Sequence, residues 1–424
     1  MRAGRRILPV LLLVAAVTAP ATAQTSLGPP APTNSEPPPV QQNPTPLPKQ
    51  GLSFNPDAGV VYQSGDFRVT TWGYAERAID PDGPDYFRRV RQGVEIDLPR
   101  LTDRVRPAIV YEVDLTNTNF FGDFGGKGGN LGRRNFENLF VSLQHPDDPG
   151  RFRLLVGENT HIISREDNLS SGNLPTINRS LILEEHGSVG SFSSQFGVEF
   201  QKALSDKLTV QLAALDNRGS LNTPDPRYSI GNSLSGKVIL TPVNGDGRKL
   251  TIGAAVDHTR DIRDRVFTLV TALGAKARGG VAATGNKLTG EADVAYTFPL
   301  LGHATTVEAE AIYSRFSGSH ADVGGGYAMV QFSLFDTPQT GDLDLFARYD
   351  VVSLGIDSLA GRATQQAVRA GVNYNPPRTN KLANLHLEYA HNALSGPVTI
   401  VTDRDPGDEV RLVLRVSLQR YTRH

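Results

Sequence analysis

From residue 58 onward, apolar and polar residues alternate in a series of segments that are each about ten residues long, the length of a tilted membrane-crossing strand. In residues 249–256, for example, Leu250, Ile252, Ala254 and Val256 fall on one face. A period of two places alternate side chains on opposite sides of a sheet, whereas the 3.6-residue period of a helix is weak throughout. The pattern therefore predicts an all-β chain.

Sixteen segments carry this pattern, and a further short strand over 58–63 is an additional candidate. The expected strands cover 66–77, 86–98, 106–115, 135–144, 151–158, 192–201, 206–215, 232–241, 249–259, 288–298, 304–315, 325–335, 342–352, 365–375, 383–393 and 409–420. A soluble β-sandwich would alternate in the same way, so alternation alone does not separate a sandwich from a barrel.

The connections between these segments favour a barrel. Longer and shorter connections alternate, and the shorter ones contain turn residues, as in Asn244–Gly247 and Asn375–Pro377. Short periplasmic turns and longer external loops are typical of transmembrane antiparallel β-barrels. The longest connection, 159–191, would be the third external loop. Long loops without periodicity are usually functional, and we expect this one to fold into the lumen and narrow it.

The N-terminal residues predict export. Arg2, Arg5 and Arg6 precede an apolar stretch that ends at a small-residue cleavage pattern, which is typical of a signal peptide over residues 1–23. Residues 24–57 begin with a proline-rich stretch that lacks the apolar residues of a core, and we interpret them as a periplasmic tail. This tail is either a spacer or a ligand for peptidoglycan or another partner. Residues 58–424 would form the barrel.

Composition narrows the function classes. The absence of cysteine excludes disulfide frameworks, cysteine-ligated zinc and thiol catalysis. Removing residues 1–23 leaves 40 basic and 44 acidic residues, a balance that gives no reason to expect a nucleic-acid partner. The mean hydropathy of −0.27 argues against helical membrane spans but fits a barrel, in which every second residue faces water. We find no motif for a catalytic or metal site, and we expect no cofactor.

Several segments together resemble the phosphate-selective porin O and P family of outer-membrane porins, over most of residues 66–420. They are Arg88–Glu95, Leu155–Glu158 leading to Arg165-Glu166 and Asn178–Ser180, Phe346–Asp350, Gly371–Pro376 and Leu385–Tyr389. The resemblance implies a sixteen-stranded barrel, often a homotrimer, with the third loop as its constriction. It also implies anion transport, with phosphate as the named solute of the family.

Charged residues on the faces opposite the apolar ones would line the lumen. The basic candidates for selectivity are Arg89, Arg91, Arg151, Arg153, Arg165, Arg179, Arg348 and Arg369. The opposing acidic wall would comprise Glu308, Glu310, Asp342, Asp344 and Asp350. Rings of charged side chains set ion selectivity in pores, so we expect basic and acidic walls to face each other across the constriction.

These observations predict a porin of the bacterial outer membrane, not an enzyme, that gives passive diffusion to small polar or anionic solutes. Lipid and lipopolysaccharide would surround it. The alternative is an outer-membrane or secreted β-protein that acts as a binding module, an adhesin or a surface enzyme. A surface enzyme would need a converging nucleophile and base, which the sequence does not show.

Overall fold

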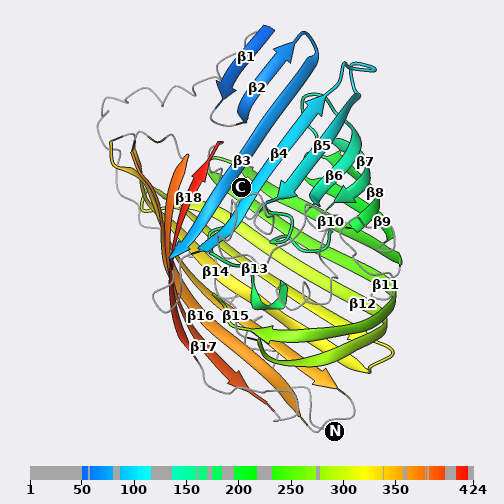
Figure 1. Ribbon diagram of the computed structural model, residues 1–424, viewed down its shortest axis with the longest axis vertical. Coiled ribbons are helices and arrows are strands. Elements are labelled where there is room, and N and C mark those ends of the chain that lie inside the picture. Colours follow the sequence, from blue (N-terminus) through cyan, green and yellow to red (C-terminus); the bar gives the residue numbers. More distant parts are fainter. Residues whose placement is uncertain are drawn as a thin grey trace, which may run out of the picture. The chain divides into compact units, whose positions relative to one another are not determined.

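Sixteen antiparallel strands close into a ring in the computed structural model of the chain (Figure 1). The structure describes residues 50–55, 58–79, 86–115, 136–159, 162–169, 174–183, 195–216, 232–273, 277–337, 339–356, 361–377, 379, 382–396 and 407–418. The expected signal peptide and most of the expected tail lie outside these residues. All of the described residues belong to one compact unit, Leu47–His424.

The strands follow the predicted segments closely. The first nine are β1 (Gln50–Asn55), β2 (Gly59–Ser64), β3 (Phe67–Ile79), β4 (Tyr86–Asp97), β5 (Arg106–Asp114), β6 (Phe136–Gln144), β7 (Phe152–Asn159), β8 (Gln195–Ser205) and β9 (Leu208–Asp216). The others are β10 (Asn232–Gly245), β11 (Arg248–Val270), β12 (Ala277–Leu300), β13 (His303–Phe316), β14 (Ala321–Thr337), β15 (Gly341–Ile356), β16 (Arg362–Asn375), β17 (Ala383–Ser395) and β18 (Asp408–Ser417).

The ring closes between β18 and β3. Each strand from β3 to β18 pairs with the next one along the chain, and β18 then pairs with β3 from Leu412 opposite Ile79 to Ser417 opposite Tyr74. Closure satisfies the backbone groups at both edges, which a membrane-spanning sheet requires. The prediction of an antiparallel barrel of sixteen strands is confirmed.

Strands β1 and β2 extend the wall at this seam. Residues Val60–Ser64 of β2 pair with Phe67–Thr71 of β3, next to the stretch of β3 that pairs with β18. The short strand expected over 58–63 is therefore present as β2. Strand β1 pairs with β2 and falls within the range 24–57 that we interpret as the tail.

Tight turns connect neighbouring strands at one end of the barrel. The hairpins β10–β11 and β12–β13 turn at Asp246-Gly247 and Leu301-Gly302, and all four residues have positive φ. Two successive residues with positive φ form the turn type whose twist matches that of the strands. We call this end of the barrel the short-turn end.

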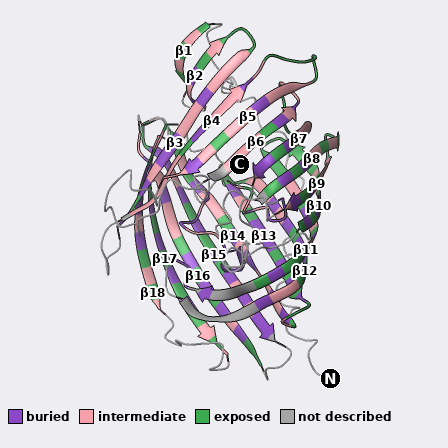
Figure 2. Cartoon of the chain, turned by 45° about the vertical axis from the view of Figure 1, so that its right-hand side comes forward, coloured by how far each residue is buried: buried purple, intermediate pink, exposed green. Residues whose placement is uncertain are grey.

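The two faces of the wall differ in the way expected of a membrane barrel. Along β16, outward-facing Val368 is 53% exposed, whereas its inward-facing neighbour Arg369 is fully buried. The same alternation runs along most strands, where exposed and buried residues follow one another (Figure 2). Apolar side chains on the outside and charges on the inside invert the order of a soluble protein and suit a lipid surround. In the described part of the chain, no helix has the length and apolar character needed to cross a membrane.

Candidate functional site

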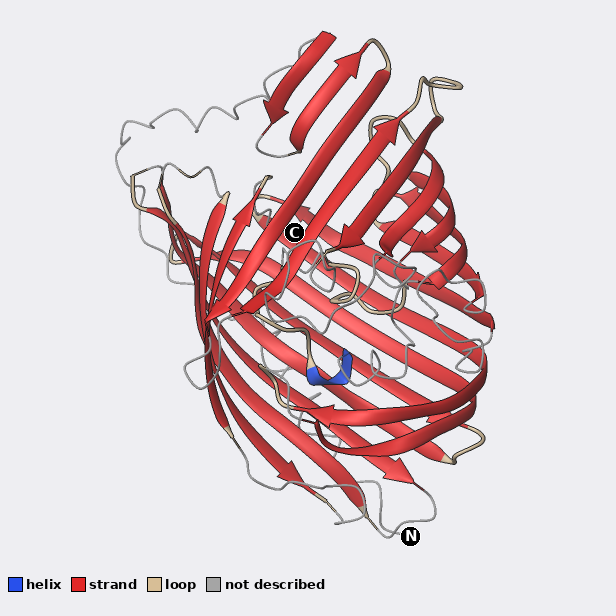
Figure 3. Ribbon diagram, viewed as in Figure 1, coloured by secondary structure: helices blue, strands red, loops and turns tan. Residues whose placement is uncertain are grey.

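The connection between β7 and β8 makes contact with the inner wall of the barrel. Its described residues are 162–169 and 174–183, which we call the lumen segment, and they include a short helical turn at Leu181–Leu183 (Figure 3). Helices are absent from the wall, so this turn marks the position of the segment in the picture. The contacts below tie the segment to β10, β13 and β15–β17 on one side and to β4 on another.

Arg348 of β15 forms the central contact. Its guanidinium donates to the Glu166 carboxylate at 2.5 and 3.2 Å and to the Asp350 carboxylate at 3.0 Å, and all three side chains are buried. Its planar group also lies over the Tyr327 ring, 3.9 Å from the ring centroid. A planar guanidinium can serve two carboxylates and a ring face at once, which a lysine cannot.

Electrostatics stabilise the charged form of Glu166. Burial alone would favour its neutral form, but the Arg348 guanidinium and the backbone N–H of Ser180 hold the pKa of Glu166 below its usual value. For Arg165, burial opposes the charge, and the nearby carboxylates, led by Glu308 at 3.6 Å, raise the pKa of the guanidinium. Both groups of the lumen segment are therefore ionised at neutral pH.

A second contact joins the segment to β16 and β17. Arg369 donates to the Glu388 carboxylate at 2.5 Å and to the backbone carbonyls of Asn178 and Arg179 at 2.9 and 3.1 Å. The same carboxylate accepts the backbone N–H of Ile177 at 2.6 Å. Wall side chains thus satisfy the backbone of an irregular segment, which would otherwise be costly to bury.

A third contact comes from β10. The Lys237 ammonium donates to the carbonyl of Ile163 at 2.7 Å and forms ion pairs with Glu291 and Asp293 at 3.3 and 3.0 Å. Glu310 of β13 accepts the backbone N–H of Glu166 at 3.1 Å. Charged side chains from separate strands therefore converge on a single turn of the lumen segment.

Arg88 contacts the segment from β4. The ladder between β3 and β4 shifts there, because Glu76 pairs with Arg89 and Arg77 with Phe87, which leaves Arg88 as an extra residue. The Arg88 guanidinium reaches Glu76 at 2.6 Å and also binds the carbonyl of Ile177 and the side chain of Asn178. Strict alternation cannot predict this contact, since a bulge re-aims a side chain without leaving a local sequence signal.

The structure brings together six of the predicted lining residues. They meet around the lumen segment and are Arg165, Arg348, Arg369, Glu308, Glu310 and Asp350. Arg179 instead binds within its own segment, to Asp167 and to the carbonyl of Leu169. Asp342 and Asp344 lie near the short-turn end, where they accept hydrogen bonds from Asn375 and Gln331. Arg151 lies in the β6–β7 turn, 62% exposed and beside Asp148.

Three arginines on β4, β5 and β7 are less buried than Arg348 and Arg369, which contact the lumen segment. Arg153 is 30% exposed while its partner Glu199 is 3% exposed, and Arg89 is 14% exposed above the fully buried Glu76. Arg106 is likewise more exposed than Asp97. In each of these pairs the arginine side chain is the more exposed partner and the carboxylate is buried. Arg91 differs, because Asp114 and Glu112 beside it are at least as exposed.

Sequence reasoning missed Arg88, Lys237 and Glu388 as contacts of the lumen segment. Lys237 and Glu388 do face inward by alternation, but period two gives a residue's face and not its partner. Among the described residues, no group of three or more His, Asp or Glu side chains could hold a metal ion.

Neither a protein-family model nor a curated protein sequence matches the chain. Solved structures do match. In-vitro-folded OmpT, an outer-membrane protein of Vibrio cholerae, has a TM-score of 0.55 at 11% identity, over 84% of this chain and 99% of that one. A trimer form of OmpT has a TM-score of 0.51 at 12% identity, over 82% of this chain and 98% of that one. The outer-membrane channel DcaP of Acinetobacter baumannii gives 0.51 at 14%, over 83% and 97%. At these identities the likeness establishes the fold of outer-membrane β-barrels.

Proposed function

We propose that the chain forms a passive pore in the bacterial outer membrane and prefers small anions, phosphate among them. The lumen segment is its constriction. Solutes pass between this segment and the wall of β5 and β7, beside the contact by which Arg88 ties the segment to β4. They enter from the side of the long connections and leave at the short-turn end.

The arrangement of the ion pairs on that wall supports the anion preference. Arg153, Arg89 and Arg106 each pair with a more deeply buried carboxylate, which leaves the arginine as the more exposed member of the pair, most of all at Arg153. A guanidinium has five donors and uses only some of them in an ion pair. The remaining donors offer a passing anion brief and weak contacts, which conduction requires.

Three further observations fit this proposal. The solved structures of similar fold include an outer-membrane channel. The sequence resembles phosphate-selective porins over most of the barrel. The wall also has an apolar outer face and a charged inner face, the arrangement of a barrel with an aqueous interior. The homotrimer implied by the resemblance belongs to the same proposal, and chemical cross-linking of the native membrane tests it.

Planar bilayers test the pore. We expect purified protein to insert with stepwise conductance and a reversal potential that shows anion preference in a potassium chloride gradient. The double variant Arg89→Gln/Arg153→Gln should move the reversal potential toward the cation value, because two lining charges are lost while the carboxylates beneath them remain. Replacing chloride with phosphate or an organic anion then ranks the solutes.

Arg151→Gln is the matched control. It removes the same type of charge two residues from Arg153, but from an exposed turn. Its reversal potential should equal that of the wild type. An unchanged reversal potential in Arg89→Gln/Arg153→Gln would exclude these arginines as the basis of selectivity. Absence of conductance from folded wild-type protein would instead favour a binding module, an adhesin or a surface enzyme.

A further inference from the structure

Strands β11 and β12 continue beyond the wall of the barrel. Strand β10 pairs with β11 only as far as Thr259, and β13 pairs with β12 only from Lys287 onward. Residues 260–273 and 277–286 therefore have no neighbouring strand in the wall. They pair with each other as far as Val270 opposite Ala277, and at the base Thr284 and Asn286 also bind the backbone of Ser317–Ser319. We call this extension the inner hairpin.

The inner hairpin bends at its base. Its ladder shifts register on both sides of Ile262, which pairs with Gly285, and Asp261 and Gly285 both have positive φ. A side chain at Gly285 would lie 2.3 Å from the backbone nitrogen of Gly318, so only glycine fits there. Bulges bend a strand, and here they turn both strands at the same level. Figure 1 shows the ends of β11 and β12 curving across the barrel.

The tip of the hairpin binds the wall at β17 and β18, several strands further round the ring. Glu409 accepts the hydroxyl of Thr271 at 2.6 Å and the backbone N–H of Leu273 at 2.9 Å. Asn392 accepts the backbone N–H of Ala272 at 3.0 Å. Two wall side chains thus satisfy three polar groups of the tip. We call this set of hydrogen bonds the dock.

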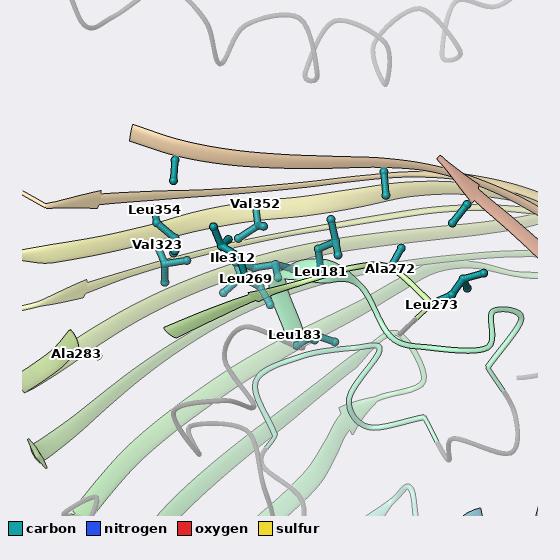
Figure 4. Close-up of a cluster of buried hydrophobic side chains, with 14 of the residues drawn as sticks. Leu181, Leu183, Leu269, Ala272, Leu273, Ala283, Ile312, Val323, Val352 and Leu354 are labelled. Atoms are coloured by element: carbon teal, nitrogen blue, oxygen red, sulfur yellow. The ribbon is translucent and has the colours of Figure 1, made fainter. Parts of the chain in front are cut away.

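Apolar side chains of the hairpin pack against the lumen segment and the inner face of the wall. Leu269, Ala272 and Leu273 pack with Leu181–Leu183 of the lumen segment and with inward-facing wall residues (Figure 4). The wall residues lie near the ends of strands remote from the short turns, and they include Ile312, Phe316, Val323, Val352 and Leu354, all essentially buried. The lumen face of a membrane barrel is normally polar, so an apolar inner wall needs a permanent cover.

The hairpin also supports the lumen segment. Asn178, which Arg88 holds from one side, donates its side-chain amide to the carbonyl of Ala272 at 3.1 Å. The segment is therefore fixed between the wall and the hairpin tip. Neither element could move away from β17 and β18 without breaking its own contacts with that wall or its contact with the other element.

We infer that the inner hairpin is a fixed partition that determines specificity. It closes the half of the lumen next to β12–β18 and holds the lumen segment against that wall, so that solutes pass only along the wall of β5 and β7, beside the contact of Arg88 with the segment. Asn392 and Glu409 are positioning residues, since they act on solutes through the hairpin. This inference rests on the proposed pore function.

The double variant Asn392→Ala/Glu409→Ala tests the partition by removing the dock. We expect single-channel conductance to rise about twofold and the anion preference to fall, because the covered half of a lumen wide enough for an aqueous channel reopens. Leu273→Cys reports the release: the chain has no cysteine of its own, so a maleimide added from the aqueous phase labels this position alone. Labelling should be slow when the dock is intact and fast in the double variant.

His391→Ala/Asp408→Ala is the matched control. These residues neighbour the positioning pair in sequence but bind each other in exposed positions. This variant should conduct like the wild type. If labelling shows that the tip is released in Asn392→Ala/Glu409→Ala while conductance and reversal potential stay at wild-type values, the partition is wrong. Wild-type protein without conductance would instead contradict the pore itself.

A covalent lock provides a second test that does not depend on a loosened variant. The backbone nitrogen of Ala272 lies 3.0 Å from the Asn392 side chain, so Ala272→Cys/Asn392→Cys places two thiols at this contact, and loss of maleimide-reactive thiols on oxidation shows that the disulfide has formed. The oxidised variant should conduct like the wild type, since the partition does not move. A conductance of the oxidised variant that is below the wild-type value and is restored by a reductant would show that the hairpin must open and would overturn the proposal.

Discussion

Arg348 is held between one carboxylate from its own strand and one from the lumen segment. The desolvation of three buried charges is offset only because each group has a partner at hydrogen-bond distance. Arg369 with Glu388 and Lys237 with Glu291 are ion pairs between wall strands, and each of the two cations also donates to a backbone carbonyl of the segment. These ion pairs hold an irregular segment in the lumen, and each depends on the presence of both partners.

Glu166→Ala should release the lumen segment from β15. Removing one partner of an isolated buried ion pair costs about 3–5 kcal/mol, and the cost here is smaller because Arg348 keeps Asp350 as a partner. We expect a lower midpoint of thermal unfolding and noisy single-channel currents, measured against Asp148→Asn, a change in an exposed turn. Quiet channels with an unchanged midpoint would show that this pair does not hold the segment.

The same pair predicts a pH dependence. The pKa of Glu166 in the folded chain is below the ordinary value for a glutamate, about 4.5, so its stabilising effect is complete above pH 4.5. The stabilisation is lost as the pH falls through the lowered pKa. Current noise from segment motion should therefore begin only below pH 4.5, and Glu166→Gln should show that noise at neutral pH. Noise that starts near pH 7 would point to another group.

At the scale of elements, the length of β11 and β12 is the informative departure from a regular barrel. Their neighbours β10 and β13 have 14 residues each, whereas β11 has 23 and β12 has 24. The additional residues do not lengthen the wall. They turn inward where Asp261 and Gly285 have positive φ, so two backbone positions decide whether a hairpin extends outward or crosses the lumen.

Gly285→Val should weaken the bend. Its φ of +90° and the close approach of Gly318 leave no space for a side chain, and a non-glycine residue in such a conformation costs about 1–3 kcal/mol. We expect faster maleimide labelling of Leu273→Cys in this background. Gly290→Val, an exposed position on the same strand with open space around it, is the control and should label like the parent. Equal labelling in both variants would mean that the bend does not need glycine.

At the scale of the whole molecule, a closed ring separates an apolar outside from a charged inside. Exposed apolar side chains recur around the wall, on strands as far apart as β6, β11 and β16. Such an extent of exposed apolar surface on a soluble monomer would promote aggregation. In a bilayer it is the surface that contacts hydrocarbon, and it leaves the charged residues to the water-filled side.

Val368→Arg tests this orientation. A charge on the lipid face at mid-membrane costs about 2–4 kcal/mol, so the variant should fold less stably in liposomes, as measured by urea unfolding. Asp206→Arg, in the exposed turn between β8 and β9, where φ is not positive, should unfold like the wild type. Equal stability of Val368→Arg and the wild type would show that this face does not contact hydrocarbon.

Local sequence patterns were sufficient to predict most of the barrel wall. Period-two alternation predicted all sixteen strands of the ring, because the face of a side chain depends only on its parity along an extended chain. Turn residues such as Asp246-Gly247 marked the hairpins, since positive φ is a local requirement. The inner hairpin also left a signal that could have been used, because Val351 and Val352 are both apolar where alternation requires a polar residue.

By itself, then, the sequence determined the strands, their order and which side of each would meet lipid. These features depend on residues that are close together along the chain. Only the tertiary structure decided that Glu166 meets Arg348, that Arg88 leaves the alternation, and that Thr271–Leu273 dock on Asn392 and Glu409. These contacts join residues more than a hundred positions apart, apart from the bulge at Arg88. They form because closing the ring brings distant strands to a common lumen, where each buried charge must find a partner.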